Sequence, residues 1–408
     1  MKKKNMSNPL SKFFVVAGAK RLSAVEADPN KSNQHEFNGV VGFRNVFGSE
    51  RITFDTDFLY LTDEEAEEIS ESGFLTWYDS RVNNPKRSAE FRIYYKTNIA
   101  MQLAQEGDLL IIAKTTNDKL LVIICPKGST HESQLLWLFG LEESESRFVI
   151  KEYFEEKSDL GYSGKVIVSS LGLEIDEEEP DYLEDMLAKF GQKLPSTFIF
   201  SEYARNTLKD KVSAIDAPDE TLISWMMWEE KLFRTFEKRS VQEKLRTGFG
   251  KDGLDVDDFI SFSLSIQNKR KARAGYAFEN HMAVIFDFNK ITYARGVKTE
   301  RNNKPDFLFP GAVEYFDSGF QINKLTMLGL KTTAKDRWRQ IIPEADRINP
   351  KHLITLEPAI SKNQTDEMRI QSVQLVIPKS ISPTYSLDQQ KELMCLEDFI
   401  DLVRKKQS

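Results

Sequence analysis

Two short apolar runs in the C-terminal half constrain the fold most, because each can form a strand and each is bounded by a charged side chain. Asp306 stands directly before residues 307–309, and Lys331 directly follows residues 325–330. Apolar runs bounded by turn residues and charges predict strands buried in a sheet. The sequence therefore predicts that a carboxylate and an ammonium group lie at strand ends of one central sheet.

A carboxylate and a lysine at neighbouring strand ends can support phosphodiester hydrolysis. The carboxylate can hold a hard cation, and the ammonium group can steady the attacking water. An Asp and a Lys at this separation also occur in most proteins, where they are simply solvated at strand ends. The pair alone does not distinguish a metal-dependent phosphodiesterase from an ordinary sheet.

Lys331 is followed by a dense polar segment that contains Lys335, Asp336, Arg337 and Arg339. Cationic donors alternate there with one acceptor, as readout of base edges in a major groove requires. The donors suit guanine O6 and N7, and the carboxylate suits the cytosine amino group, so the segment favours adjacent C·G pairs. The alternative is a helical salt bridge between Asp336 and Arg339, which contributes little on a surface.

These motifs resemble the catalytic core of the EcoRII group of type II restriction endonucleases, which are PD-(D/E)XK nucleases. The similarity lies in residues 303–310 and 330–346, and it extends from about Leu194 to the C-terminus. The resemblance implies an α/β nuclease domain over residues 194–404, with a mixed central sheet flanked by helices. It also implies Mg²⁺ as the cofactor and assigns DNA readout to residues 335–337.

Four residues carry the chemistry according to this resemblance. Asp306 is implied as a metal ligand, Lys331 as the catalytic lysine, and Glu344, 13 positions beyond Lys331, as the second metal carboxylate. Glu279 matches a further acidic residue that binds a second cation or orients a water, with an exposed helical glutamate as the alternative. Pro343 departs from the family pattern, because the family takes its second carboxylate from a helix and proline bends a helix.

Length and composition bound the remaining possibilities. The 408 residues suffice for two domains, and 40% hydrophobic with 29% charged residues is typical of a globular chain. No apolar stretch approaches membrane-span length, so we expect a cytoplasmic protein without membrane contact. Cys125, Cys395 and four histidines predict neither a disulfide nor a zinc site. The net charge of −7 does not exclude DNA as a partner, since phosphate binding depends on local basic surface.

Residues 10–173 have mostly strand and turn signals and predict a β-rich domain. Residues 109–112 and 120–124 flank a polar turn and predict a buried hairpin. Further strands are expected at 93–95 and 165–168. One helix is expected near residues 64–72.

Two segments of this domain resemble the DNA-gripping arms of the EcoRII effector domain, a pseudobarrel of the plant B-three type. The residues concerned are Lys20, Arg21, Arg92, Tyr94, Lys96 and Asn98. These side-chain types suit phosphates and base edges. An ordinary half-exposed strand is the alternative for residues 92–98.

Residues 174–193 are crowded with Asp and Glu around Pro180 and predict a solvated acidic linker. A sharper alternative is that the linker mimics DNA over a basic cleft. Beyond it the spacing is helical from Thr197, and separate helices are expected at 255–265 and 272–286. The basic run between those two helices fits contact with the DNA backbone or minor groove, or else a solvated face. Its candidate residues are Arg270, Lys271 and Arg273.

The resemblance implies a Mg²⁺-dependent type II restriction endonuclease that cleaves double-stranded DNA at a CCWGG-like site, W being A or T. Its N-terminal domain would bind a second site copy as an allosteric effector. A monomer or a homodimer is compatible, and a cognate DNA methyltransferase would be the genetic partner. The alternatives are a catalytically inert two-domain DNA-binding regulator and a junction resolvase, of which the latter explains residues 335–337 poorly.

Overall fold

The computed structural model describes residues 9–27, 35–84, 86–141, 147–154, 160–173, 175, 180–208, 212–335 and 337–408. The chain divides into two compact units. Unit 1 comprises residues 1–174 together with Pro358–Thr365, and unit 2 comprises residues 175–357 and 366–408. Among the described residues, no helix has both the length and the apolar character needed to cross a bilayer.

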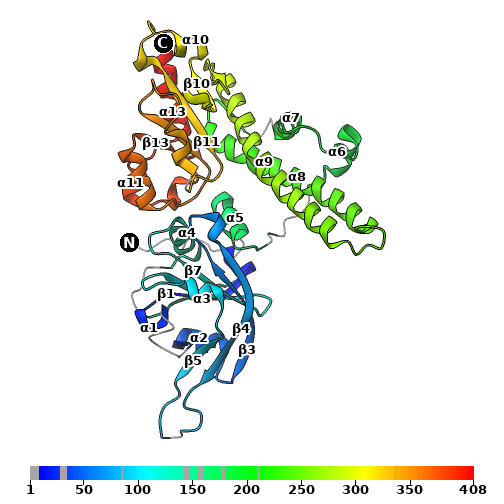
Figure 1. The fold of residues 1–408 in the computed structure, drawn as a ribbon, viewed down its shortest axis with the longest axis vertical. Helices are drawn as coiled ribbons and strands as arrows, with labels where there is room; N and C mark the ends of the chain where they lie inside the picture. The colour runs from blue at the N-terminus through cyan, green and yellow to red at the C-terminus, as the bar shows by residue number, and fades with distance from the viewer. Residues whose placement is uncertain are drawn as a thin grey trace. The chain divides into compact units, whose positions relative to one another are not determined.

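Unit 1 is built on an eight-stranded, mostly antiparallel sheet that curves into a half-barrel (Figure 1). The strand order is β2-β5-β4-β3-β7-β6-β1-β8, with β3 and β7 parallel. The strands are β1 (Phe14–Arg21), β2 (Glu36–Asn38), β3 (Ile52–Tyr60), β4 (Ile69–Asp79), β5 (Phe91–Tyr95), β6 (Leu109–Thr115), β7 (Leu120–Cys125) and β8 (Val149–Glu152). The helices are α1 (Ala24–Ala27), α2 (Val41–Phe47), α3 (Ile99–Leu103), α4 (Thr130–Phe139) and α5 (Gly161–Ser170). Its core buries Phe43, Phe58 and Trp77.

The predicted hairpin and the strand at 93–95 are confirmed, whereas two other local predictions are wrong. The hairpin is the antiparallel pair β6–β7, and residues 93–95 lie in β5. Residues 165–168 lie within α5, because Gly164, Ile167 and Val168 form a buried helical face that overrides the strand preference of β-branched residues. Residues 64–72 form only a short 3-10 turn, and β4 then begins because its backbone pairs with β3.

Unit 2 combines a five-stranded mixed sheet with a helical bundle (Figure 1). In the order β13-β12-β11-β10-β9, the first three strands are parallel and the remaining pairs are antiparallel. The strands are β9 (Ala294–Arg295), β10 (Phe307–Phe309), β11 (Thr326–Lys331), β12 (Lys351–Thr355) and β13 (Val373–Val376). The helices of this half of the chain are α6 (Leu183–Phe190), α7 (Thr197–Leu208), α8 (Pro218–Thr247), α9 (Val256–Phe288), α10 (Ala312–Phe316), α11 (Lys362–Ile370), α12 (Leu387–Gln390) and α13 (Leu396–Gln407).

The two expected helices at 255–265 and 272–286 are one continuous helix, α9, of 33 residues. Asp255 caps it by accepting a hydrogen bond from the Asp258 amide, and Figure 1 shows α9 lying along α8. The stretch between the expected helices stays helical because Lys, Arg and Ala at 269–273 favour a helix, and Arg270 also pairs with Glu237 of α8. Residues 183–190, within the expected linker, form α6.

The C-terminal end of α9 is anchored on the strand that follows Asp306. The Phe286 ring lies 5.2 Å, between ring centroids, from both Phe307 and Phe309 of β10, and 6.3 Å from Phe399 of α13. Aromatic pairs at these separations add to the stabilisation from buried area. The cluster therefore fixes the position of α9 relative to the sheet edge where the candidate site lies.

Candidate active site

Asp306 and Lys331 meet at one edge of the unit 2 sheet. Because β10 and β11 are antiparallel with Phe307 opposite Leu328, the start of β10 lies beside the end of β11. The Leu330 amide donates to Asp306 Oδ2 at 2.6 Å. Burial raises the pKa of Asp306, and the Leu330 amide and the Lys331 charge oppose that rise. Both strand-end positions predicted from the sequence are therefore found, and they bring the two charges together.

Glu344 reaches the same place from a turn and not from a helix. A 3-10 helix spans Arg337–Ile341, and the Glu344 amide donates to the Ile341 carbonyl at 3.1 Å as the chain leaves that helix. Pro343 therefore breaks nothing, since the helix has already ended. Gly329 of β11 permits this approach, because a side-chain Cβ there would lie 2.6 Å from Ile341 Cγ2.

The Glu344 carboxyl group has a strongly raised pKa. Burial, followed by the negative charge of Asp306, raises its pKa to about 7, while Lys331 and Lys351 act in the opposite direction. Its Oε2 atom is buried and has no hydrogen-bond partner among the described residues. Two mutually repelling carboxylates and an unpaired buried oxygen suit a hard divalent cation, which takes oxygen ligands. Asp306 and Glu344 could therefore hold such an ion, with water and phosphate as its remaining ligands.

Glu279 lies near this pair but already has a partner. It projects from α9 and forms a 3.0 Å ion pair with Arg295 Nη2. Its charge contributes to the raised pKa of Asp306, and Arg295 lowers that pKa. Arg295 belongs to β9, lies opposite Phe307 in the sheet register, and places its guanidinium over the Phe307 ring. Sequence reasoning missed Arg295, because a two-residue strand leaves no periodic signal.

A second cluster of side chains that could bind a metal ion lies elsewhere in unit 2. Asp219, Cys395 and Glu397 bring three ligand atoms within 4.8 Å of one another, and they alone do so among the residues that the structure describes. The Asp219 carboxylate accepts hydrogen bonds from the amides of Lys379, Leu396 and Glu397, each at 3.0 Å. These bonds account for the buried carboxylate as a cap on the start of α13.

The backbone at the start of the predicted DNA-readout segment, residues 335–337, is held by a buried glutamate. The Ala334 and Lys335 amides donate to Glu357 Oε2 at 2.5 and 3.0 Å. Glu357 is almost fully buried and was not singled out from the sequence, where it follows an apolar strand without a motif. Arg337 is exposed at the start of the 3-10 helix. The support thus fixes the backbone while leaving the Arg337 side chain at the surface.

The other members of this segment have different placements. Arg339 pairs with Glu367 at 2.5 Å and lies over the Trp338 ring. Arg339 thus has a partner other than Asp336, which lies outside the described residues.

The basic run on α9 is divided between surface and core. Arg270 pairs with Glu237, and Lys271 is exposed. Arg273 lies 5.1 Å from the ring centroids of both Phe200 and Phe233, and its Nη1 donates to the Pro195 carbonyl at 3.1 Å. Burial lowers the pKa of Arg273. These partners are typical of an arginine that packs a bundle core.

Of the candidate DNA-binding residues of unit 1, four have partners within the unit and two are exposed. Lys20 is 4% exposed and pairs with Glu26 at 2.5 Å, and Arg21 pairs with Glu132. Arg92 contacts Asn38 and Glu90. Asn98 caps α3 by accepting a hydrogen bond from the Met101 amide at 2.9 Å. Tyr94 and Lys96 are exposed, on and just beyond β5.

Comparison with known proteins finds relatives for the C-terminal half. Residues 233–400 match the family model described as EcoRII C terminal. Over 201 residues the chain is 41% identical to the type II restriction enzyme EcoRII of Escherichia coli, an alignment that covers 49% of this chain and 47% of that protein. The chain therefore spans about half the length of the curated relative it matches. The resemblance to EcoRII that the motifs predict for the C-terminal half is confirmed over residues 233–400.

Two solved structures are also similar to this chain. Metal-depleted Ecl18kI in complex with uncleaved, modified DNA is 19% identical, with a TM-score of 0.45, and the match covers 55% of this chain and 83% of that one. A complex of the restriction endonuclease PspGI with substrate DNA is 15% identical, with a TM-score of 0.43, and covers 52% and 93%.

Proposed function

We propose that this chain is a Mg²⁺-dependent type II restriction endonuclease that hydrolyses double-stranded DNA at a CCWGG-like site. The observation that carries the proposal is the convergence of Asp306, Lys331 and Glu344 at one sheet edge, inside residues 233–400, which match the EcoRII C terminal family model. The relative is a type II restriction enzyme, and the charge pattern of the site suits that chemistry.

Each side chain of the site would have a separate role in hydrolysis. Asp306 and Glu344 would each give a carboxylate oxygen to Mg²⁺, which when bound polarises the phosphodiester and stabilises the leaving oxygen. Lys331 would orient the attacking water with its ammonium group and stabilise the charge that develops on the phosphate. Attack of the water oxygen forms a new bond to phosphorus and breaks the bond to the leaving oxygen. The products are a phosphomonoester on one fragment and a hydroxyl on the other, and the water proton passes through solvent to the leaving oxygen.

Sequence selection would come from residues 335–337, next to the catalytic lysine. Lys335 and Arg337 would donate to guanine O6 and N7, and Asp336 would accept from a cytosine amino group. The Glu357 support for the backbone at Lys335 favours this role, because readout needs side chains that start from a fixed position.

The N-terminal part, residues 10–173, would be an effector domain of the plant B-three pseudobarrel type that binds a second copy of the site. Residues 174–193 would connect it to the nuclease domain at 194–404. The curved sheet and the exposed side chains of Tyr94 and Lys96 favour this assignment. Activation by the second copy would require that the nuclease domain bind DNA differently when the first domain is occupied.

The test is digestion of DNA of known sequence by the full chain with Mg²⁺ and with EDTA, followed by sequencing of the fragment ends. We expect Mg²⁺-dependent cleavage at one short site, no cleavage by Asp306→Ala or Lys331→Ala, and retained DNA binding by both variants. Site-specific binding without cleavage by the unaltered chain would instead support the inert regulator. Cleavage at branched DNA without sequence preference would support a resolvase.

A further inference from the structure

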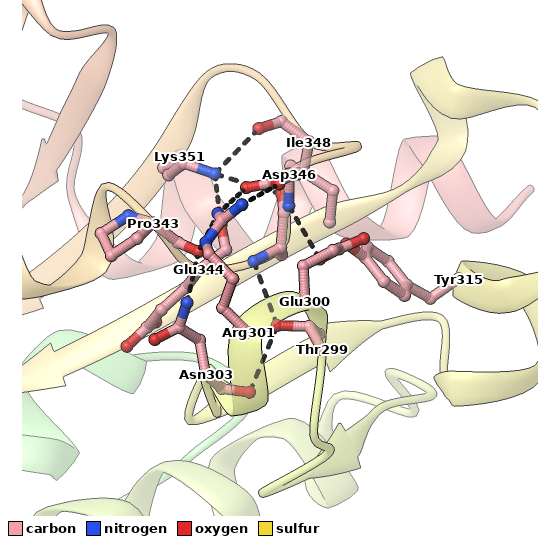
Figure 2. A network of polar contacts seen from close by, with 11 residues as sticks. Thr299, Glu300, Arg301, Asn303, Tyr315, Pro343, Glu344, Asp346, Ile348 and Lys351 are labelled. Atoms are coloured by element: carbon pink, nitrogen blue, oxygen red, sulfur yellow. Dashed lines mark hydrogen bonds and ion pairs between the residues drawn. The ribbon is translucent and has the colours of Figure 1, made fainter.

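The loop that precedes Asp306 and the turn that contains Glu344 are joined by hydrogen bonds (Figure 2). Residues 299–303 lie just before Pro305 and Asp306, and residues 343–346 contain Glu344. The Ala345 amide donates to Thr299 Oγ1 at 3.3 Å, the Asp346 amide donates to Glu300 Oε2 at 3.2 Å, and Arg301 Nη2 and Asn303 Nδ2 donate to the Pro343 carbonyl at 3.0 and 2.8 Å. We call these two loops the carboxylate clamp.

Lys351 fixes the same turn from the start of β12. Its ammonium group donates to the carbonyls of Glu344, Ala345 and Ile348, the latter two at 3.1 and 3.4 Å (Figure 2). Burial lowers the pKa of Lys351. Taking an ammonium group out of water is costly, and three carbonyl partners offset that cost. The backbone on both sides of the Glu344 side chain is therefore bonded to charged or amide donors.

The carboxylate clamp contains three residues whose backbone conformations are energetically unfavourable. Arg301, Asn302 and Ala345 have φ values of +56°, +62° and +48°, in the left-handed region. Each such residue costs roughly 1 kcal/mol or more, and such strain persists only where surrounding contacts enforce it. The ion pair between Arg301 and Asp346, at 2.5 and 2.8 Å, is one of those contacts. Strain on both loops next to the site indicates that the position of the turn matters.

We propose that Asn303 and Lys351 are positioning residues, which hold the Glu344 carboxylate at the separation from Asp306 that a divalent cation requires. This inference rests on the proposed metal-dependent function. Asp306 and Glu344 come from different loops, so one ion can bind both only if the loops keep a fixed separation. Mg²⁺ demands near-ideal geometry at about 2.0–2.1 Å, so a small movement of the turn removes Glu344 from its shell. Loss of such supporting contacts typically weakens metal binding or activity about 10–100-fold.

The test compares Lys351→Met and Asn303→Ala with Lys406→Met in the full chain. Lys406 is a matched control, because its half-buried ammonium group also donates to unit 2 groups, the Leu325 carbonyl and Thr326 Oγ1, but at the opposite end of β11. Mn²⁺ binding is measured by electron paramagnetic resonance, and the cleavage rate is measured against Mg²⁺ concentration. Thermal unfolding in EDTA reports stability.

We expect Lys351→Met and Asn303→Ala to weaken Mn²⁺ binding and to raise the half-saturating Mg²⁺ concentration about 10–100-fold. Their maximal rate at saturating Mg²⁺ should fall less, and DNA binding in EDTA should be unchanged. Lys406→Met should keep the wild-type Mg²⁺ curve even where it lowers the unfolding temperature. If Lys351→Met does not fold, Asn303→Ala, which loses one hydrogen bond, decides the question alone.

Wild-type metal curves for folded Lys351→Met and Asn303→Ala would overturn the positioning role while leaving the proposed function intact. A wild-type chain whose Mn²⁺ binding is absent, or is unaffected by Asp306→Ala, would overturn the proposed function and the clamp with it. The two failures are therefore distinguishable in one set of measurements.

Discussion

Replacing Glu344 by Gln should abolish cleavage and, in the absence of metal, stabilise the protein at alkaline pH. Burial and the Asp306 charge raise the Glu344 pKa from 4.5 to about 7. A carboxyl group with a raised pKa in the folded state contributes full stability below pH 4.5, and that contribution is lost as pH rises through about 7. At 1.36 kcal/mol per pH unit, keeping the group ionised above pH 7 costs up to about 3 kcal/mol. The glutamine variant does not pay this electrostatic cost. Its net gain in stability is reduced by the free energy lost where the buried amide lacks hydrogen-bond partners.

The assay is urea unfolding of the full chain in EDTA at pH 5 and pH 8.5. The unfolding midpoint of Glu344→Gln should exceed that of the wild type at pH 8.5 and approach it at pH 5. Glu392→Gln serves as the control, because the Glu392 side chain is 52% exposed and its removal should shift neither midpoint appreciably. Added Mg²⁺ should stabilise the wild type and not Glu344→Gln. A glutamine variant that is less stable than the wild type at pH 8.5 would show that Glu344 is not electrostatically strained.

Two further predictions concern the site and its neighbours, and a third concerns the core of the sheet. Arg337→Ala should weaken binding to the cognate site by roughly 1–3 kcal/mol with little change on random DNA, as measured by fluorescence anisotropy; equal losses would mark a phosphate contact. Arg295→Ala should lower the cleavage rate without affecting DNA binding, and adding Glu279→Gln should give less than the sum of the two effects, because the residues form one ion pair. Burial lowers the pKa of His352 to about 4, so its contribution to stability is lost as pH falls from 6.5 toward 4. The unfolding midpoint of His352→Leu should therefore fall less steeply over that range, and parallel curves would refute the assignment.

The sequence predicted those parts of the site that depend on strand ends. Asp306 and Lys331 adjoin apolar runs that had to be buried as strands of one sheet. Each residue was therefore expected at a strand end. Glu344 was placed by resemblance, but its turn was not predictable, because that turn depends on tertiary contacts from Asn303 and Lys351.

Local patterns failed where tertiary packing decided the outcome. The β-branched residues Val166, Ile167 and Val168 lie in a helix, because that helix has a buried face. The polar stretch within α9 consists largely of residues that favour a helix, and α8 supplies a partner for Arg270. Arg273 looked like one more surface cation, although two phenylalanine rings enclose it.

The continuity of α9 makes its second half intolerant of insertions and deletions. An α-helix turns about 100° and rises about 1.5 Å per residue. Arg273 is fixed between two rings of the bundle, and Glu279 lies six positions later beside Arg295. One residue added between them would rotate Glu279 by about 100°, to the flank of the helix, without altering any side chain of the site. Variation in length among related chains should therefore collect in the turn before Val256, where an added residue rotates nothing that the sheet edge depends on.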